Sequence, residues 1–137
     1  MNKNTVDQYN LTFEDKVCDW GKYGKSIIKV VDTNNQYLTA FLNSWNSAEQ
    51  IANSLLSDIN DALNNPDQEI ESDSATVDII MHRNEVDFYD DNLGYVNSIP
   101  LQDFKEIVIG WRDFLKTPST KKSKILLFFS NFFEIRK

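Results

Sequence analysis

Apolar residues recur at helical spacing between Pro100 and Leu115, and this stretch organises the predicted fold. Neighbouring apolar positions lie three or four residues apart, which places them on one face of a helix. Pro100 suits the first helical turn, and Pro118 stops the helix. A helix with such a face needs an apolar surface to cover, and we expect that surface to be a β-sheet. The apolar positions are Leu101, Phe104, Ile107, Val108, Trp111, Phe114 and Leu115.

A second helix is predicted from Asn46 to Asn64. Asn46 is expected to cap its N-terminus, with Glu49 as the partner in a capping box. The run Asn64-Asn65-Pro66 is expected to end it. Its apolar stripe is Ala48, Ile51, Ala52, Leu55, Leu56, Ile59, Ala62 and Leu63.

Short β-branched or alternating runs predict the strands. Asn in the pair Arg83-Asn84 favours a tight hairpin turn, whereas residues 18–25 read as a turn and Asp67–Ser74 as an acidic loop. The resulting fold class is α+β, a mostly antiparallel β-sheet of about five strands with two helices packed on one face. The strands are predicted at Tyr9–Phe13, Ser26–Val31, Tyr37–Trp45, Ala75–His82 and Glu85–Tyr89, and Tyr37–Trp45 also fits the start of a helix.

At 137 residues the chain fits a single α+β domain over residues 1–118, followed by a tail over residues 119–137. The tail begins with the basic run Ser119–Lys124 and continues with the apolar run Ile125–Ile135. Three interpretations of the tail remain open. It packs on the domain, it is loosely attached, or it anchors the protein to a membrane surface through lysine and phenylalanine side chains.

Charge is distributed unevenly along the chain. Residues 1–115 carry 20 acidic and 8 basic side chains, a net charge of −12, whereas residues 116–137 carry +5. A body at −12 repels phosphates, which argues against nucleic-acid binding. The same charge attracts a partner with a basic surface and speeds the encounter with it.

Catalytic and metal-binding patterns are sparse in the sequence. The single histidine, His82, ends a predicted strand and shares a strand face with Asp78. An enzyme using this pair is one hypothesis, and a solvated hairpin histidine is the other. No cysteine–histidine spacing suits zinc, and no glycine-rich phosphate loop is present. We therefore predict a non-enzyme with no metal site and no cofactor.

Acidic side chains gather around the predicted hairpin, with tyrosines between them. They form either a patch that docks on a basic protein or a solvated face that maintains solubility. An aromatic group at Trp20, Tyr23, Tyr37, Phe41 and Trp45 likewise fits core and edge packing or a binding hot spot. The predicted partner-binding residues are Glu69, Glu71, Asp73, Glu85, Asp87, Tyr89, Asp90 and Asp91.

The compartment is predicted from three absences in the sequence. Cys18 is the only cysteine and has no intramolecular disulfide partner, which fits a reducing compartment. The first ten residues lack an apolar signal region. No apolar run reaches the roughly 20 residues that cross a bilayer. We expect a cytoplasmic protein.

The run VDIIMHRNEVDFYDDN followed by IPLQDFKEIVIGWRDFL resembles small acidic bacterial immunity proteins of polymorphic toxin and contact-dependent inhibition systems. In several such families a sheet hairpin precedes an Ile-Pro-Leu-x-x-Phe helix that has Trp and Phe-Leu near its end. The resemblance covers roughly residues 75–117. It implies a cytoplasmic protein that binds a cognate toxin, often a nuclease, and blocks its active site or substrate path. Such families share no single set of binding residues, so none is carried over to this chain.

Two functions follow as hypotheses. The first is an immunity protein that neutralises a toxin with a basic surface through its acidic residues. The alternative is a non-enzymatic accessory protein recruited to a membrane surface or an assembly by residues 119–137.

Overall fold

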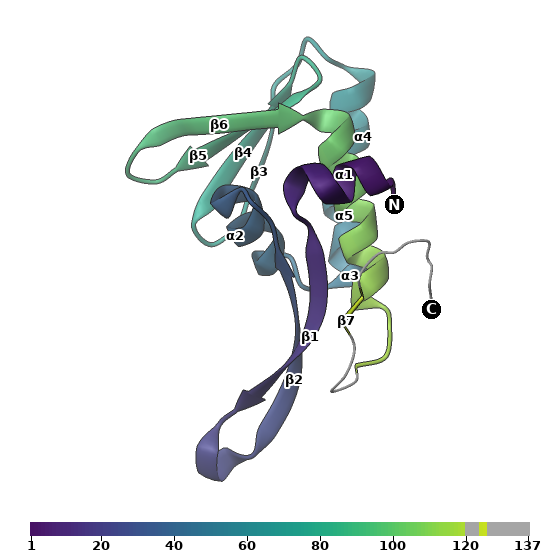
Figure 1. Cartoon of the computed structure of the whole chain (residues 1–137). Coiled ribbons are helices and arrows are strands. Elements are labelled where there is room, and N and C mark those ends of the chain that lie inside the picture. The colour runs from purple at the N-terminus through teal and green to yellow at the C-terminus, as the bar shows by residue number, and fades with distance from the viewer. Residues whose placement is uncertain (120–123, 126–137) are drawn as a thin grey trace.

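The structure is a computed structural model that describes residues 1–119 and 124–125. It has an α+β fold, as predicted, in which helices cover one side of a four-stranded antiparallel sheet (Figure 1). Most of the predicted tail lies outside the described residues. Along the chain the elements are α1 (Lys3–Tyr9), β1 (Thr12–Asp19), the 3-10 turn η1 (Gly21–Tyr23), β2 (Lys25–Asp32), α2 (Gln36–Ser44), α3 (Ala48–Gln50), the π-helical segment η2 (Ile51–Leu55), α4 (Leu56–Asn64), β3 (Ile70–Asp73), β4 (Val77–His82), β5 (Glu85–Asp90), β6 (Gly94–Pro100), α5 (Leu101–Leu115) and β7 (Lys124–Ile125).

The four-stranded sheet has the order β3-β4-β5-β6 and grows by consecutive hairpins. The predicted tight turn between β4 and β5 is confirmed, because Arg83 and Asn84 both adopt left-handed backbone conformations with φ of 50° and 63°. Two such residues in succession match the twist of a two-residue hairpin. The predicted acidic loop at residues 67–74 is wrong in part, since Ile70–Asp73 forms the edge strand β3.

Helix α5 lies across this sheet and supplies the centre of the core, as its periodicity predicts. Phe104 is fully buried, and its ring lies 6.3 Å from that of Phe88 on β5 and 5.9 Å from that of Phe41 on α2. Further along, Trp111 is fully buried and donates its indole N–H to the carbonyl oxygen of Trp45 at 2.7 Å. The helix therefore ties the sheet to α2, and it also packs against the run of α3, η2 and α4.

The second predicted helix is also confirmed, as the continuous run of α3, η2 and α4. Its predicted cap is wrong by one residue. Ser47, not Asn46, accepts a hydrogen bond from the backbone N–H of Gln50 at 3.3 Å. A serine hydroxyl satisfies an otherwise unpaired N–H of the first turn as well as an asparagine does.

Of two strands predicted near the N-terminus, Tyr37–Trp45 is wrong and Tyr9–Phe13 is wrong in part, because only its last two residues belong to β1. Tyr37–Trp45 is the helix α2, the alternative that its sequence left open, and Asn35 caps it by accepting from the N–H groups of Tyr37 and Leu38. Its buried residues recur at helical spacing, which decides against a strand. At Tyr9–Phe13, α1 ends at Tyr9, Asn10 turns the chain with φ of 48°, and β1 begins only at Thr12.

The remaining strands form a second sheet, of order β2-β1-β7. β1 and β2 make a long hairpin that extends away from the body of the molecule (Figure 1). Its base packs on α5, where Phe13 is buried with ring centroids 5.6 Å from both Trp111 and Phe114. Gly110 leaves space at this contact, since a Cβ there would clash with the end of the Met1 side chain and would lie 3.3 Å from the Phe13 ring.

A buried ion pair marks the point where the hairpin leaves the core. Lys29 Nζ lies 2.7 Å from Asp15 Oδ1 and 4.4 Å from the centre of the Phe114 ring. Beyond this pair, none of the helices in the described part of the chain lies beneath the two strands. We call residues 16–28 the arm, because they project past the body (Figure 1).

Candidate functional site

The four-stranded sheet has one side covered by helices and one side that is open among the described residues. Side chains alternate along each strand. On β4, Ile79 and Met81 are buried beneath the helices, whereas Asp78 points the other way and is exposed. We call the open side the acidic face. Its members are Glu71, Asp73, Asp78, Ile80, His82, Glu85, Asp87, Tyr89, Tyr95 and Ser98.

Strand register brings the acidic residues into neighbouring positions. Asp73 on β3 lies directly opposite Asp78 on β4, which in turn lies opposite Tyr89 on β5. Like charges in directly paired positions destabilise a sheet. Within residues 1–119, no lysine or arginine forms an ion pair with a carboxylate of this face. The face therefore has a negative electrostatic potential, and a cationic partner would reduce the repulsion between its carboxylates.

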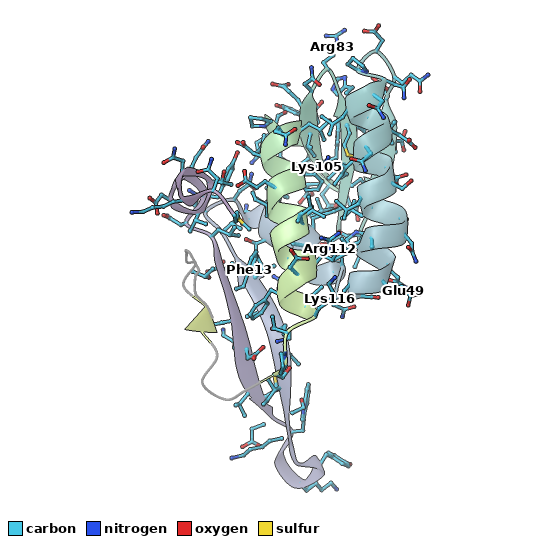
Figure 2. All side chains as sticks on the ribbon, turned by 90° about the vertical axis from the view of Figure 1, so that its right-hand side faces the viewer. Phe13, Glu49, Arg83, Lys105, Arg112 and Lys116 are labelled. Atoms are coloured by element: carbon cyan, nitrogen blue, oxygen red, sulfur yellow. The ribbon has the colours of Figure 1, made fainter. Side chains whose placement is uncertain are left out.

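Basic side chains lie on a different side of the molecule. Figure 2 looks onto the helices, and Lys105, Arg112 and Lys116 project from α5 toward the viewer. Because α5 covers the opposite side of the sheet, these cations are separated from the acidic face by the core. The helical side is mixed in charge, because Asp103, Glu106 and Asp113 also lie on α5, whereas the open side of the sheet has no lysine or arginine among its members.

One acidic residue of the face is held by internal contacts. Asp87 is only 9% exposed; one carboxylate oxygen lies 2.6 Å from His82 Nε2 and the other accepts from Ser98 Oγ at 2.6 Å. The Tyr95 hydroxyl lies 2.8 Å from the same Ser98 oxygen. Asp87 therefore orders the surface around it and offers little of itself to a partner.

This network differs from the pairing expected for His82. The sequence placed Asp78 beside His82, but the described contact is with Asp87 across the hairpin. A serine nucleophile needs a base within hydrogen-bond reach, with a third group orienting that base. Here the Asp87 carboxylate lies between the imidazole and the hydroxyl. Ser98 therefore donates to Asp87 and has no described hydrogen bond with His82, which differs from the order of groups in a serine triad.

Two tyrosines form the aromatic part of the acidic face. The rings of Tyr89 and Tyr95 meet edge to face with centroids 5.9 Å apart, and Tyr95 is 57% exposed. Desolvation raises the pKa of Tyr89, and the negative charges of Asp87 and Glu69 raise it further. Its hydroxyl is therefore a neutral donor at physiological pH, and the exposed Tyr95 ring is available for contact with a cation.

A cavity adjoins the acidic face where β3 meets the helices. Its volume is about 340 Å³, and the Trp45 indole at its wall donates to the Asp73 carbonyl oxygen at 3.0 Å. Several carboxylates point into or border it, so it suits the head of a lysine or arginine side chain. The lining residues are Trp45, Ser54, Asp58, Glu71, Ser72, Asp73 and Asp78.

Asp58 in this cavity gives a pH-dependent prediction. Desolvation raises its pKa in the folded protein, and the charge of Asp61 raises it further. Such a group favours folding at pH values below its unfolded pKa, and this contribution is lost as pH rises through the folded pKa. We expect Asp58→Asn to raise Tm at pH 7 by a few degrees and to leave Tm nearly unchanged near pH 3. Thermal unfolding at both pH values, with Asp7→Asn as a surface control, checks this; a decrease in Tm at pH 7 would contradict it.

The predicted partner-binding residues divide into two groups. Glu71, Asp73, Glu85, Asp87 and Tyr89 lie together on the acidic face. Glu69 immediately precedes β3, and its charge acts on the pKa of Tyr89, so it lies at the border of the same face.

The other two predicted residues lie in the β5–β6 turn. Asp90 Oδ1 accepts from the backbone N–H groups of Asn92 at 2.8 Å and Leu93 at 3.1 Å, so its carboxylate holds the turn. Asp91 is exposed beside it. The predicted set of partner-binding residues omits Asp78 and Tyr95, although both belong to the acidic and tyrosine residues around the predicted hairpin. The alternation of side chains along the predicted strand was enough to place Asp78 on this face.

The aromatic group predicted as one unit is split by the fold. Phe41 is fully buried, and Tyr37 and Trp45 pack at the border of the core. Trp20 and Tyr23 instead lie at the tip of the arm, 57% and 81% exposed. Packing explains the first three residues and does not explain the last two.

Three further observations concern metal binding, membrane-spanning helices and similarity to known proteins. Among the described residues, no group of three or more His, Cys, Asp or Glu side chains is arranged to hold a metal ion. None of the helices in the same part of the chain has the length and apolarity to cross a membrane. Comparisons with protein-family models, with curated proteins and with solved structures found no match for this chain.

Proposed function

We propose that this protein is an immunity protein that binds the basic surface of a cognate bacterial toxin in the cytoplasm and blocks it without chemistry of its own. The observation that carries the proposal is the acidic face, where Asp73 and Asp78 lie directly opposite each other with no lysine or arginine paired to them among the described residues. A surface built this way is costly for the protein alone and favourable once a basic partner covers it.

The first step of binding is electrostatic. Residues 1–115 carry a net charge of −12, which attracts a positively charged toxin over distances of about one Debye length. The acidic face then orients the encounter, because among the described residues no lysine or arginine is paired with its carboxylates, whereas the charges of α5 are mixed. The final complex would bury roughly 1,200–2,000 Å² in total.

The second step is local recognition. Tyr89 and Tyr95 provide aromatic rings beside carboxylates, the combination that holds a desolvated lysine or arginine. The cavity beside Trp45 and Asp73 offers a second position for a cationic side chain. Both positions face the same partner if it covers the acidic face and its β3 border.

The class of toxin follows from the same charge argument. A nuclease carries a basic surface that contacts phosphates. An acidic protein face competes for that surface directly, so inhibition requires no conformational change. The resemblance of residues 75–117 to immunity proteins of toxin systems supports the same class.

Co-expression with a candidate toxin tests the proposal. Where the gene directly upstream encodes a large protein, the C-terminal domain of that protein is expressed with and without this chain. We expect growth only when the chain is present, and co-elution of the two purified proteins. Growth arrest despite the chain, with no complex, would overturn the proposal. A chain lacking residues 119–137 serves as the second arm: equal protection supports the acidic face, whereas lost protection with an intact fold supports tail-based recruitment.

A further inference from the structure

The arm is a surface that toxin binding by the acidic face leaves unexplained. It is a two-stranded ribbon beyond the buried Asp15–Lys29 pair. Isolated two-stranded ribbons are marginally stable in water and gain stability when another surface covers them. Its exposed large side chains are Val17, Trp20, Tyr23 and Ile28.

The arm also carries positive charge. Lys16, Lys22 and Lys25 outnumber its one acidic residue, Asp19. Lys22 Nζ lies 5.2 Å from the centre of the Tyr23 ring, so cation and aromatic ring are presented together at the tip. Trp20 is held in place by donation from its indole N–H to Ser26 Oγ at 2.7 Å. The tip is therefore basic, aromatic and ordered.

The acidic face is complementary to the arm in charge, and like the arm it presents aromatic side chains. It is negative, and it exposes Tyr95 beside Tyr89. Within one molecule the two surfaces lie at opposite ends, the sheet at one end and the hairpin tip at the other (Figure 1). The arm of a molecule is therefore far from its own acidic face.

We propose that the arm of one copy of this chain docks on the acidic face of a second copy. Because arm and face lie at opposite ends, a two-fold axis across the molecule lets each copy give its arm to the other. The resulting pair is closed, and it places lysines on unpaired carboxylates and Trp20 and Tyr23 against the tyrosine pair. This self-association goes beyond the proposed function and does not depend on it.

An anionic membrane is the competing occupant of the arm. Lysines and interfacial aromatic residues suit a lipid surface. However, the apolar side chains are spread along the ribbon, with Val17 and Ile28 exposed well before the tip. The strand register puts Val17 and Ile28 on opposite faces of the ribbon, so a flat lipid surface would cover only one of them. A membrane would also leave the acidic face without its complement.

Sedimentation velocity of the purified full chain tests the proposal over a range of protein and salt concentrations. We expect a concentration-dependent dimer at low salt that weakens as salt is added. The charge-reversed arm variant Lys22→Glu/Lys25→Glu should raise the dissociation constant by about tenfold or more. Lys3→Glu/Lys116→Glu changes net charge equally outside the arm and should weaken association much less. Both pairs of lysines are exposed, so circular dichroism should show an unchanged fold.

A mixing experiment separates this pairing from other modes of association. The arm variant keeps its acidic face, and Asp73→Asn/Asp78→Asn/Glu85→Gln keeps its arm. Each is expected to be monomeric alone, and the mixture should form a one-to-one pair through the single remaining arm–face contact. A wild-type chain that stays monomeric at every concentration overturns the proposal. So does a mixture that stays monomeric, or an arm that binds phosphatidylglycerol vesicles without self-association.

Discussion

Neutralising the exposed carboxylates of the acidic face will slow association with the toxin partner that we propose by about tenfold to a hundredfold at low ionic strength. The reason is that these side chains supply the local field that steers a basic partner, while Asp87 and Asp90 are occupied by internal hydrogen bonds. The rate will also depend less on salt, since fewer charges remain to be screened. Stopped-flow association at several salt concentrations measures both effects. The variant replaces Glu71, Asp73, Asp78 and Glu85 by their amides.

The matched control removes the same number of charges elsewhere. Its folded stability should stay close to that of the wild type, because these residues lie outside the core, and the acidic-face variant should be slightly more stable because it removes the repulsion between Asp73 and Asp78. If the two variants slow association equally, net charge alone steers the partner and the acidic face has no special role. The control replaces Asp7, Asp32, Glu49 and Asp113 by their amides.

Replacing Trp111 by alanine will destabilise the protein by about 3–5 kcal/mol. The side chain is fully buried, its ring contacts Phe13 at the base of the arm, and its N–H bonds to the Trp45 carbonyl oxygen. The substitution leaves a large cavity and an unpaired carbonyl where α5 meets both β1 and the end of α2. The free energy of unfolding of such a domain is only about 5–15 kcal/mol, so the substitution removes much of it.

Urea unfolding followed by circular dichroism measures this loss. Trp111→Phe is the control, because it retains most of the apolar volume and removes only the indole hydrogen bond. Its cost should be smaller, about 1–3 kcal/mol. A loss below about 1 kcal/mol for the alanine variant would contradict the packing of α5 against the hairpin.

The acidic residues of β5 show what the alternation of side chains along a strand can predict and what it cannot. Glu85 and Asp87 follow the same alternation, and both lie on the open side of the sheet as expected. Their surroundings differ, because Ser98 from β6 and His82 from β4 enclose Asp87 and leave Glu85 exposed. Alternation predicts the side of a sheet, whereas exposure depends on what the neighbouring strands contribute.

Local sequence patterns are likewise insufficient to predict two whole elements, the helix α2 and the arm. Tyr37–Trp45 is a short apolar run whose periodicity fits two structures, and contact with Phe104 and the sheet favours the helix. Trp20 and Tyr23 resemble core residues by composition, yet they lie beyond the last core contact of the hairpin. Burial of an aromatic residue depends on which surfaces reach it, and those surfaces come from distant parts of the chain.

By itself, the amino-acid sequence determined the α5 helix, the long helix before β3, the β4–β5 turn and the negative charge of the body. These features depend on periodicity, turn chemistry and composition, which act between near neighbours or over the whole chain. Only the tertiary structure decided that the strands divide into two sheets, that Asp73 faces Asp78, and that a basic aromatic arm stands apart from the core. Strand pairing and burial arise between residues far apart in the sequence, and no local pattern specifies them.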